Sequence, residues 1–166
     1  SAYFQMKTNW QRQRDYLEAL TNAQWAIEYC GSSLRQAEGG KNAGTKLTGG
    51  GINLKYMINQ SGVEQEQFLW RGNTLNAYDE RGKLYHCIKD KAGSNPPGAC
   101  NESTIVEVAN LIVDNPGAGK ADDFFRRQTN GQNKDKWIDL LITCGKGGQN
   151  VTLFTRVKLR NEVPKP

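Results

Sequence analysis

The sequence predicts an α+β protein in which one long N-terminal helix packs on an antiparallel β-sheet. Near the N-terminus apolar residues recur at steps of three and four, whereas several later segments alternate apolar and polar residues. The 166 residues also include 18 glycines, which is typical of turns between short strands rather than of an all-helical protein. We therefore expect a helical segment over residues 1–38 and a β-rich head over residues 39–166.

The predicted helix runs roughly from Met6 to Gln36 and is closed by Gly39-Gly40. The residues that this spacing places on one face are Met6, Trp10, Gln13, Leu17, Leu20, Gln24, Ile27, Cys30 and Leu34. Small residues widen that face: Ala19, Ala23, Ala26 and Ala37. The first two turns are polar nearly all round, so we expect the first half to project from the head. Ser1-Ala2 is interpreted as a tag remnant, which extends through residues 1–5 at most.

The first half of the head is predicted to contain a flexible link and short strands. Residues 39–51 are rich in glycine and are interpreted as a connection without a core of its own. Ile52–Ile58 alternates as a half-buried strand does, and Gln67–Arg71 is predicted as a second short strand. A hairpin is expected over residues 75–88, with strands at 75–78 and 84–88 and Gly82 in its turn.

The second half of the head is predicted to end in a β-hairpin. Ile105–Val113 is interpreted as a bent strand, and Ala121–Gln128 as a helical turn. Trp137–Thr143 and Val151–Arg160 are expected to pair through a glycine-rich turn. The last strand has an apolar face with Val151, Leu153, Val157 and Leu159, and a second face with Thr152, Phe154, Arg156, Lys158 and Arg160.

The charge balance is mildly basic, with a formal net charge of +5. Nucleic-acid binding would require the basic residues to cluster on one face, and the sequence has only short clusters. These clusters are Arg12/Arg14, Arg126-Arg127 and Arg156/Lys158/Arg160. We interpret them as an ordinary solvated surface. No apolar run approaches the roughly 18 residues that a membrane-spanning helix requires.

The chain has four cysteines, Cys30, Cys87, Cys100 and Cys144. None forms a C-x-x-C pair and His86 is the single histidine, so we expect neither a metal site nor a cofactor. An even count in a glycine-rich domain favours an oxidising compartment, with reduced buried thiols as the alternative. Of the three possible pairings we favour Cys87–Cys100, which closes the loop over residues 91–99. Cys30–Cys144 would then tie the helix to a late strand.

The candidate catalytic residues point away from an enzyme. His86 and Cys87 are neighbours in a predicted strand, so their side chains point to opposite faces and cannot form a nucleophilic pair. We interpret His86 as a surface residue, and an enzyme would need a buried polar cluster around it. Gly117–Lys120 lacks the flanking residues of a phosphate-binding loop, since Asp114 and Ala121 occupy those positions.

Three segments carry a resemblance to a known family. They are ALTNAQWAIEYCGSSLRQAE at the helix end, INLKYMINQSGVEQEQFLW…GKLYHC in the middle, and IDLLIT…VTLFTRVKLRN at the tail. In this order, after a long helix, they resemble type IV pilin-like proteins, and within these the PilW/GspJ group of minor pilins and minor pseudopilins. The segments are spread over nearly the whole chain.

The resemblance implies a structural subunit rather than an enzyme. Such proteins are inserted in the bacterial inner membrane, processed by a prepilin peptidase, and assembled with other minor pilins and the major pilin. They form a tip complex that primes an extracellular pilus. Their hydrophobic half-helix is missing from this sequence, and Tyr3, Phe4 and Met6 are interpreted as the end of it. The first alternative is a type II secretion minor pseudopilin, whose partners are other pseudopilins.

The resemblance also assigns roles along the helix. Docking on the sheet is expected from Leu17, Leu20, Ile27 and Leu34. Contacts with partner subunits are expected from Met6, Trp10, Arg12 and Arg14. A second alternative is a pilus-associated module that binds DNA or a surface. It requires the Arg156/Lys158/Arg160 row to be accessible and contiguous with Arg126-Arg127.

Overall fold

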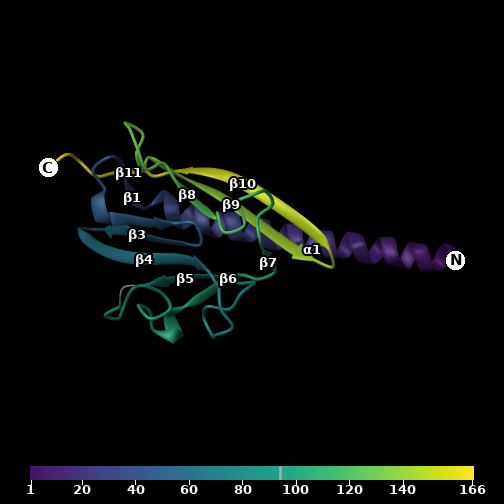
Figure 1. Ribbon diagram of the computed structural model, residues 1–166. Helices are drawn as coiled ribbons and strands as arrows, with labels where there is room; N and C mark the ends of the chain where they lie inside the picture. Colours follow the sequence, from purple (N-terminus) through teal and green to yellow (C-terminus); the bar gives the residue numbers. More distant parts are fainter. Residues whose placement is uncertain (94) are drawn as a thin grey trace.

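The computed structural model describes residues 1–93 and 95–166 and has the α+β architecture that the sequence predicts (Figure 1). The helix α1 (Ala2–Arg35) is followed by strands β1 (Glu38–Gly39), β2 (Leu47–Gly50), β3 (Asn53–Gln60), β4 (Val63–Arg71), β5 (Leu84–Ile88), β6 (Val106–Ala109), β7 (Ile112–Val113), β8 (Phe125–Arg127), β9 (Trp137–Lys146), β10 (Gln149–Lys158) and β11 (Asn161–Glu162). Residue 94, in the loop over residues 91–99, lies outside the described residues. None of the described helices combines the length and the apolar composition that crossing a bilayer requires.

Two antiparallel sheets form the body of the head. One has the strand order β2-β3-β4-β5-β6, and in the other β9 pairs with β10, β7 and β8. The short parallel pair of β1 and β11 joins the end of the helical segment to the C-terminal strand. The second half of α1 packs against β9, β10 and β6, and its first half extends beyond the head (Figure 1).

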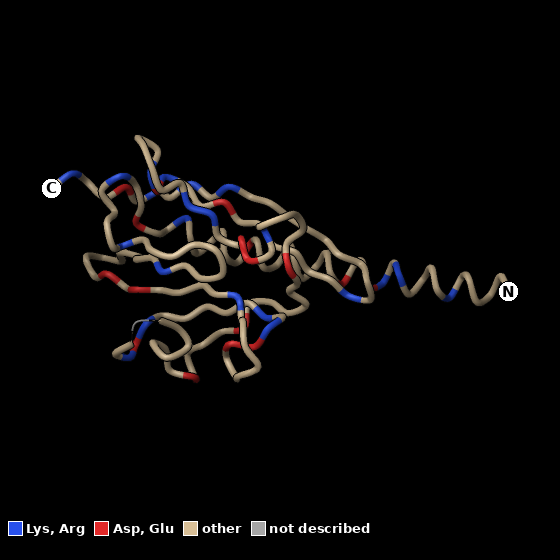
Figure 2. Tube along the Cα trace, viewed as in Figure 1, with Lys and Arg blue, Asp and Glu red and all other residues tan. Residues whose placement is uncertain are grey.

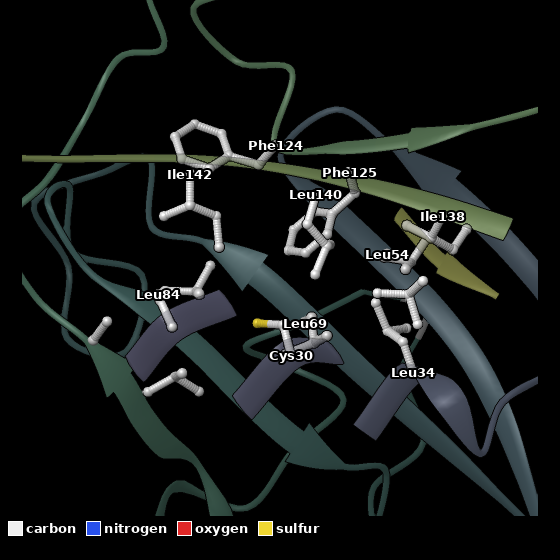
Figure 3. Packing of buried hydrophobic residues seen from close by; sticks show 14 of the residues in the cluster. Cys30, Leu34, Leu54, Leu69, Leu84, Phe124, Phe125, Ile138, Leu140 and Ile142 are labelled. Atoms are coloured by element: carbon white, nitrogen blue, oxygen red, sulfur yellow. The ribbon is translucent and has the colours of Figure 1, made fainter. Parts of the chain in front are cut away.

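The core lies between the helix and both sheets. Figure 3 shows side chains from α1, β3, β4, β5, β8 and β9 meeting there. The largest fully buried apolar side chains are Tyr56, Phe124, Phe125, Leu34, Leu47, Leu54, Leu69, Leu84, Ile138, Leu140 and Ile142. Most of these large residues lie on the strands. They pack against small residues of the helix, so the helix can approach the strands closely.

The face of α1 that packs on the head differs from the predicted one. The buried helix residues are Asp15, Ala19, Ala23, Ala26, Cys30, Gly31 and Leu34. Of the residues expected to dock, Leu34 is buried, Leu20 and Ile27 are partly buried, and Leu17 is 59% exposed, so the assignment of Leu17 was wrong. At 100° per residue Leu17 lies about 160° around the helix from Ala19, which places it on the outer side. Trp25, whose type is ordinarily buried in a helix, is also exposed.

Residues 39–51 are ordered, so the expectation of a flexible link was wrong. The helix ends earlier, at Arg35, and a strand pair, a 3-10 turn at Gly44–Lys46 and β2 follow. Ala43 and Leu47 are buried in the core. Gly39 is needed for close approach rather than for flexibility, because a Cβ there would overlap Leu159 and a backbone carbonyl oxygen.

The predicted hairpin over residues 75–88 was also wrong in part. Gly82 has a positive φ of 95°, as expected, but residues 75–78 form no strand, and β5 pairs with β4 instead. The preceding hairpin joins β3 to β4 through Ser61 and Gly62, whose φ values of 54° and 82° are both positive. This is the backbone of a two-residue hairpin turn, which lengthens the second strand beyond its predicted start at Gln67.

Two later segments form different elements from those predicted. The bent strand over Ile105–Val113 is divided into β6 and β7, which belong to different sheets, and Leu111 between them has φ 60°. The helical turn expected over Ala121–Gln128 is wrong, because Phe125–Arg127 pairs with β9 as strand β8. Phe124 and Phe125 are both fully buried, and this burial fixes the segment against the sheet.

The terminal hairpin is confirmed. β9 and β10 pair from Gln149↔Lys146 to Lys158↔Trp137, and the turn residues Gly147 and Gly148 have positive φ. Exposure alternates along the last strand as predicted: Val151, Val157 and Leu159 are buried, whereas Thr152, Phe154, Arg156, Lys158 and Arg160 are exposed.

The structure confirms one of the two cysteine pairings. Cys87 and Cys100 form a disulfide, which packs with Phe68, Trp70 and Tyr85 of the larger sheet in a second buried cluster. Cys30 and Cys144 are free thiols, so the second pairing was wrong. Burial raises the pKa of each to about 12, which disfavours the thiolate that disulfide formation requires.

Candidate functional site

The projecting half of α1, residues 2–14, is a surface that the head leaves exposed. Every residue in it is exposed except Thr8, which is partly exposed. Packing begins at Asp15, which is 7% exposed and accepts a hydrogen bond of 3.1 Å from Gln11 Nε2. At this point the tip of the β9–β10 hairpin reaches the helix, and Lys146 forms an ion pair with Glu18. The head therefore ends at Asp15, and the helix continues alone (Figure 1).

Large apolar side chains line one side of this half. We call Tyr3, Met6, Trp10, Gln13 and Leu17 the helix seam, because they recur at steps of three and four. Its apolar members are 74%, 69%, 60% and 59% exposed, in chain order. This spacing is the one by which a helix presents a continuous apolar strip to another helix. A shallow hollow of about 390 Å³ lies where the seam meets the head, beside Gln149.

The projecting half carries positive charge only. Its charged residues are Lys7, Arg12 and Arg14, with no acidic residue among residues 2–14 (Figure 2). The guanidinium of Arg14 lies 5.6 Å from the centre of the Trp10 ring. The structure thus places the predicted contact residues Met6, Trp10, Arg12 and Arg14 together on the exposed helix. Leu17 was predicted to dock on the sheet rather than to belong to this exposed strip, although its seven-residue separation from Trp10 places both on one side of the helix.

A second site lies where α1 crosses the larger sheet. We call it the His86 groove: a depression of about 440 Å³ lined by Trp25, Glu28, Tyr29, Ser32, Ser33, Gln36, Ile58, Gln60, Gln67 and His86. His86 is partly buried there and hydrogen-bonded at both ring nitrogens, so its interpretation as a surface residue was wrong.

The polar groups beneath the groove form one hydrogen-bond network. His86 Nε2 lies 2.9 Å from Gln67 Oε1, and His86 Nδ1 lies 2.9 Å from the Tyr29 hydroxyl. Because an amide oxygen only accepts, Nε2 donates to Gln67, and Nδ1 accepts from Tyr29. The Tyr56 hydroxyl also donates to Gln67 Oε1, at 3.3 Å, and lies 2.6 Å from the Ser33 hydroxyl.

Burial sets the charge state of this network. It lowers the pKa of His86 from 6.5 to about 4, so the imidazole is neutral near pH 7. It also raises the pKa of Tyr29, chiefly through desolvation. The groove floor is therefore a set of neutral groups held in fixed directions. Cys87 lies on the opposite face of β5 in its disulfide, as the alternation predicted, so it does not form a nucleophilic pair with His86. Among the described residues, no group of three or more His, Cys, Asp and Glu side chains could hold a metal ion.

The basic residues of the second sheet are adjacent but paired with acids. Strand register places Arg126 and Arg156 opposite Asp139 from its two sides. Arg156 donates to both oxygens of Asp139, at 2.7 and 3.0 Å, and its guanidinium lies over the Trp137 ring. Arg126 pairs with Asp123. Arg127 pairs with the fully buried Asp135. The exposed part of the row is contiguous, as the DNA-binding alternative requires, but carboxylates neutralise Arg126, Arg127 and Arg156.

The fold and these surfaces define an α+β protein with a projecting, partly apolar helix. No protein-family model, curated protein or solved structure matches the chain.

Proposed function

We propose that this chain is a non-enzymatic subunit of a type IV pilin-like filament, and specifically a PilW-type minor pilin of the tip complex that primes pilus assembly. The observation that carries the proposal is the helix seam on the projecting half of α1. The same helix is pinned to a β-rich head by its second half. The sequence resemblance to the PilW/GspJ group points in the same direction.

The projecting half is a helix that no other described part of the chain covers. Isolated helices shorter than about 12–15 residues are marginal in water, and most helices in proteins are stabilised by burying an apolar face. Residues 2–14 expose Tyr3, Phe4, Met6 and Trp10 instead. An adjacent helix from another subunit would cover this surface with the same spacing of contacts.

The charge of this half constrains the partner. Lys7, Arg12 and Arg14 are unopposed within the segment, so the partner surface should carry acidic side chains between its apolar contacts. We propose other minor pilins and the major pilin as these partners. The proposal includes an inner-membrane anchor contributed by an apolar segment ahead of α1, periplasmic assembly, and final location in the extracellular pilus.

A type II secretion minor pseudopilin is the alternative within the same class, because it would use the same projecting helix. Binding of DNA is a weaker alternative. Three arginines of the proposed basic surface are held by Asp123, Asp135 and Asp139, which reduces the charge available for phosphates.

Assembly in the bacterium that encodes the chain tests the proposal. Deleting the gene should reduce the number of surface pili, measured in the fraction sheared from cells, and the intact gene should restore it. Asn9→Pro interrupts the projecting helix and should not restore pili. Leu75→Ala, at a head residue that is 95% exposed, is the matched control and should restore them.

Two further readings make the result decisive. Purified Asn9→Pro should unfold at the same temperature as the unmodified protein, because Asn9 is exposed and lies in the projecting half. Loss of a secreted enzyme from the medium, with pili intact, would assign the chain to type II secretion. If deletion changes neither pili nor secretion, the proposal fails.

A further inference from the structure

We propose that the His86 groove binds a carbohydrate, held by stacking on Trp25 and by hydrogen bonds to neutral side chains of the groove. The inference does not depend on the filament proposal, because the groove is formed by residues 25–36 and by strands of the larger sheet, not by the projecting half of the helix. Its volume of about 440 Å³ lies within the range of small-ligand sites.

Trp25 lines one side of the groove with an aromatic ring that is not buried in the core. It stands on α1 beside the groove and is 57% exposed, although an indole gains stability when it is buried. Its ring centre lies 6.2 Å from that of Tyr29, with the planes inclined at 47°. Tyr29 in turn meets the His86 ring edge-on at 5.5 Å. An exposed indole whose orientation is supported by a neighbouring aromatic ring can stack on the apolar C–H face of a sugar ring.

Gln67 provides a hydrogen-bond donor, its side-chain NH₂ group, to the same groove. The residue is 5% exposed, and its amide oxygen already accepts from His86 and from Tyr56. Its NH₂ group has no hydrogen-bond partner among the described residues. This NH₂ group is not one of the fully buried polar atoms that lack a partner, so it is reachable from the groove and can donate to a ligand oxygen there. The network also fixes the direction of the amide in advance, which lowers the entropy lost on binding.

The remaining polar groups of the groove are mostly uncharged. Ser32, Gln36 and Gln60 add hydroxyl and amide groups, and these donate and accept as sugar hydroxyls do. Glu28 is the single charged residue among those that line the groove, and a carboxylate accepts hydrogen bonds from adjacent hydroxyls. The described residues that line it include no lysine or arginine, which disfavours phosphate and other anions. A cation would be held only by Glu28 and the aromatic rings, leaving the amides unused.

Binding by the purified protein tests this inference. Neutral disaccharides (chitobiose, cellobiose and maltose) are titrated while tryptophan fluorescence and backbone amide NMR signals are followed. We expect at least one of them to bind saturably, with shifts confined to the lining residues. Trp25→Ala should weaken that binding about tenfold or more. Trp10→Ala is the matched control, since this tryptophan is equally exposed on the same helix but outside the groove, and it should leave binding unchanged.

Several results would overturn the inference. One is the absence of saturable binding for all three sugars; another is sugar binding that Trp25→Ala leaves intact. Binding of tetramethylammonium without binding of any sugar would assign the groove to cations. Crosslinking from residue 25 to another subunit in intact filaments, without sugar binding, would assign it to a protein contact.

Discussion

The two halves of α1 belong to one continuous helix but have opposite relations to the rest of the molecule. Residues 15–35 bury mostly small side chains, together with Leu34, against the strands, whereas residues 2–14 bury none. The large apolar residues of the first half are exposed, and the buried face of the second half carries three alanines. Apolar character alone therefore does not identify the face that packs on the sheet. Side-chain size distinguishes it from a face suited to contact with another chain.

The close packing of the second half depends on its small residues. An alanine contributes little buried area, so the stabilising contacts come from the large side chains of the strands that reach the helix. Figure 3 shows Ile138, Leu140 and Ile142 of β9 in the core with Cys30 and Leu34 of the helix. The helix position is therefore set by the sheets, and the projecting half inherits its direction from them.

The largest effect should come from comparing two leucines of the same helix. Leu34 is fully buried and Leu17 is 59% exposed. Leu34→Ala removes core contacts and leaves a cavity, so we expect the free energy of unfolding to fall by about 2–5 kcal/mol. Leu17→Ala should change it by less than about 0.5 kcal/mol. Urea unfolding followed by circular dichroism measures both, and similar costs at the two positions would contradict the division of the helix.

The next effect is the pH dependence of the unfolding free energy. It arises at His86, which is hydrogen-bonded to Tyr29 in the packed half of the helix. The pKa of His86 is about 4 in the folded state and 6.5 in the unfolded chain. Protonation therefore favours the unfolded state, and stability is lost as the pH falls from 6.5 toward 4. Linkage gives a loss of about 2 kcal/mol between about pH 7.5 and pH 5.

His86→Gln isolates this contribution from that of the carboxylates. It removes the titrating group and keeps a polar side chain, so the difference in unfolding free energy between variant and parent should shrink as the pH falls. Trp10→Ala, in the projecting half, should retain the full pH dependence. A parallel pH profile for His86→Gln and the parent would show that His86 titrates normally in the folded state.

The sequence predicted those features that depend on local pattern. The α+β class, the terminal hairpin and the exposure of Met6 and Trp10 follow from spacing along the chain. The Cys87–Cys100 disulfide follows from the loop between its ends. In each case neighbouring residues carry the information, so no knowledge of the tertiary arrangement is needed.

The features that were missed depend on distant residues. The His86 network joins Tyr29 and Gln67, which are 57 and 19 residues away, and only the strand register and the helix position bring them together. The choice between Leu17 and Ala19 as the packed side also depends on the shape of the sheet. The chain order of apolar residues does not report that shape.

The smallest effect should locate the boundary between the two halves. Gly147 and Gly148 form the tip of the β9–β10 hairpin, with φ values of 56° and 80°. Alanine at either position adopts a left-handed conformation, which costs about 1 kcal/mol. A Cβ at Gly147 would also overlap the carboxylate of Asp15, whereas a Cβ at Gly148 meets no atom.

We therefore expect Gly147→Ala to cost about 1 kcal/mol more than Gly148→Ala, because only the first displaces Asp15 from the hairpin tip. Hydrogen exchange should report the same difference, with faster exchange at the helix amides near Gln11 and Asp15 in the first variant alone. Since both variants share the backbone strain, the difference between them measures the contact itself. Equal unfolding free energies and equal exchange would mean that the hairpin tip does not end the packed half, and that the boundary lies further along the helix toward Ala19.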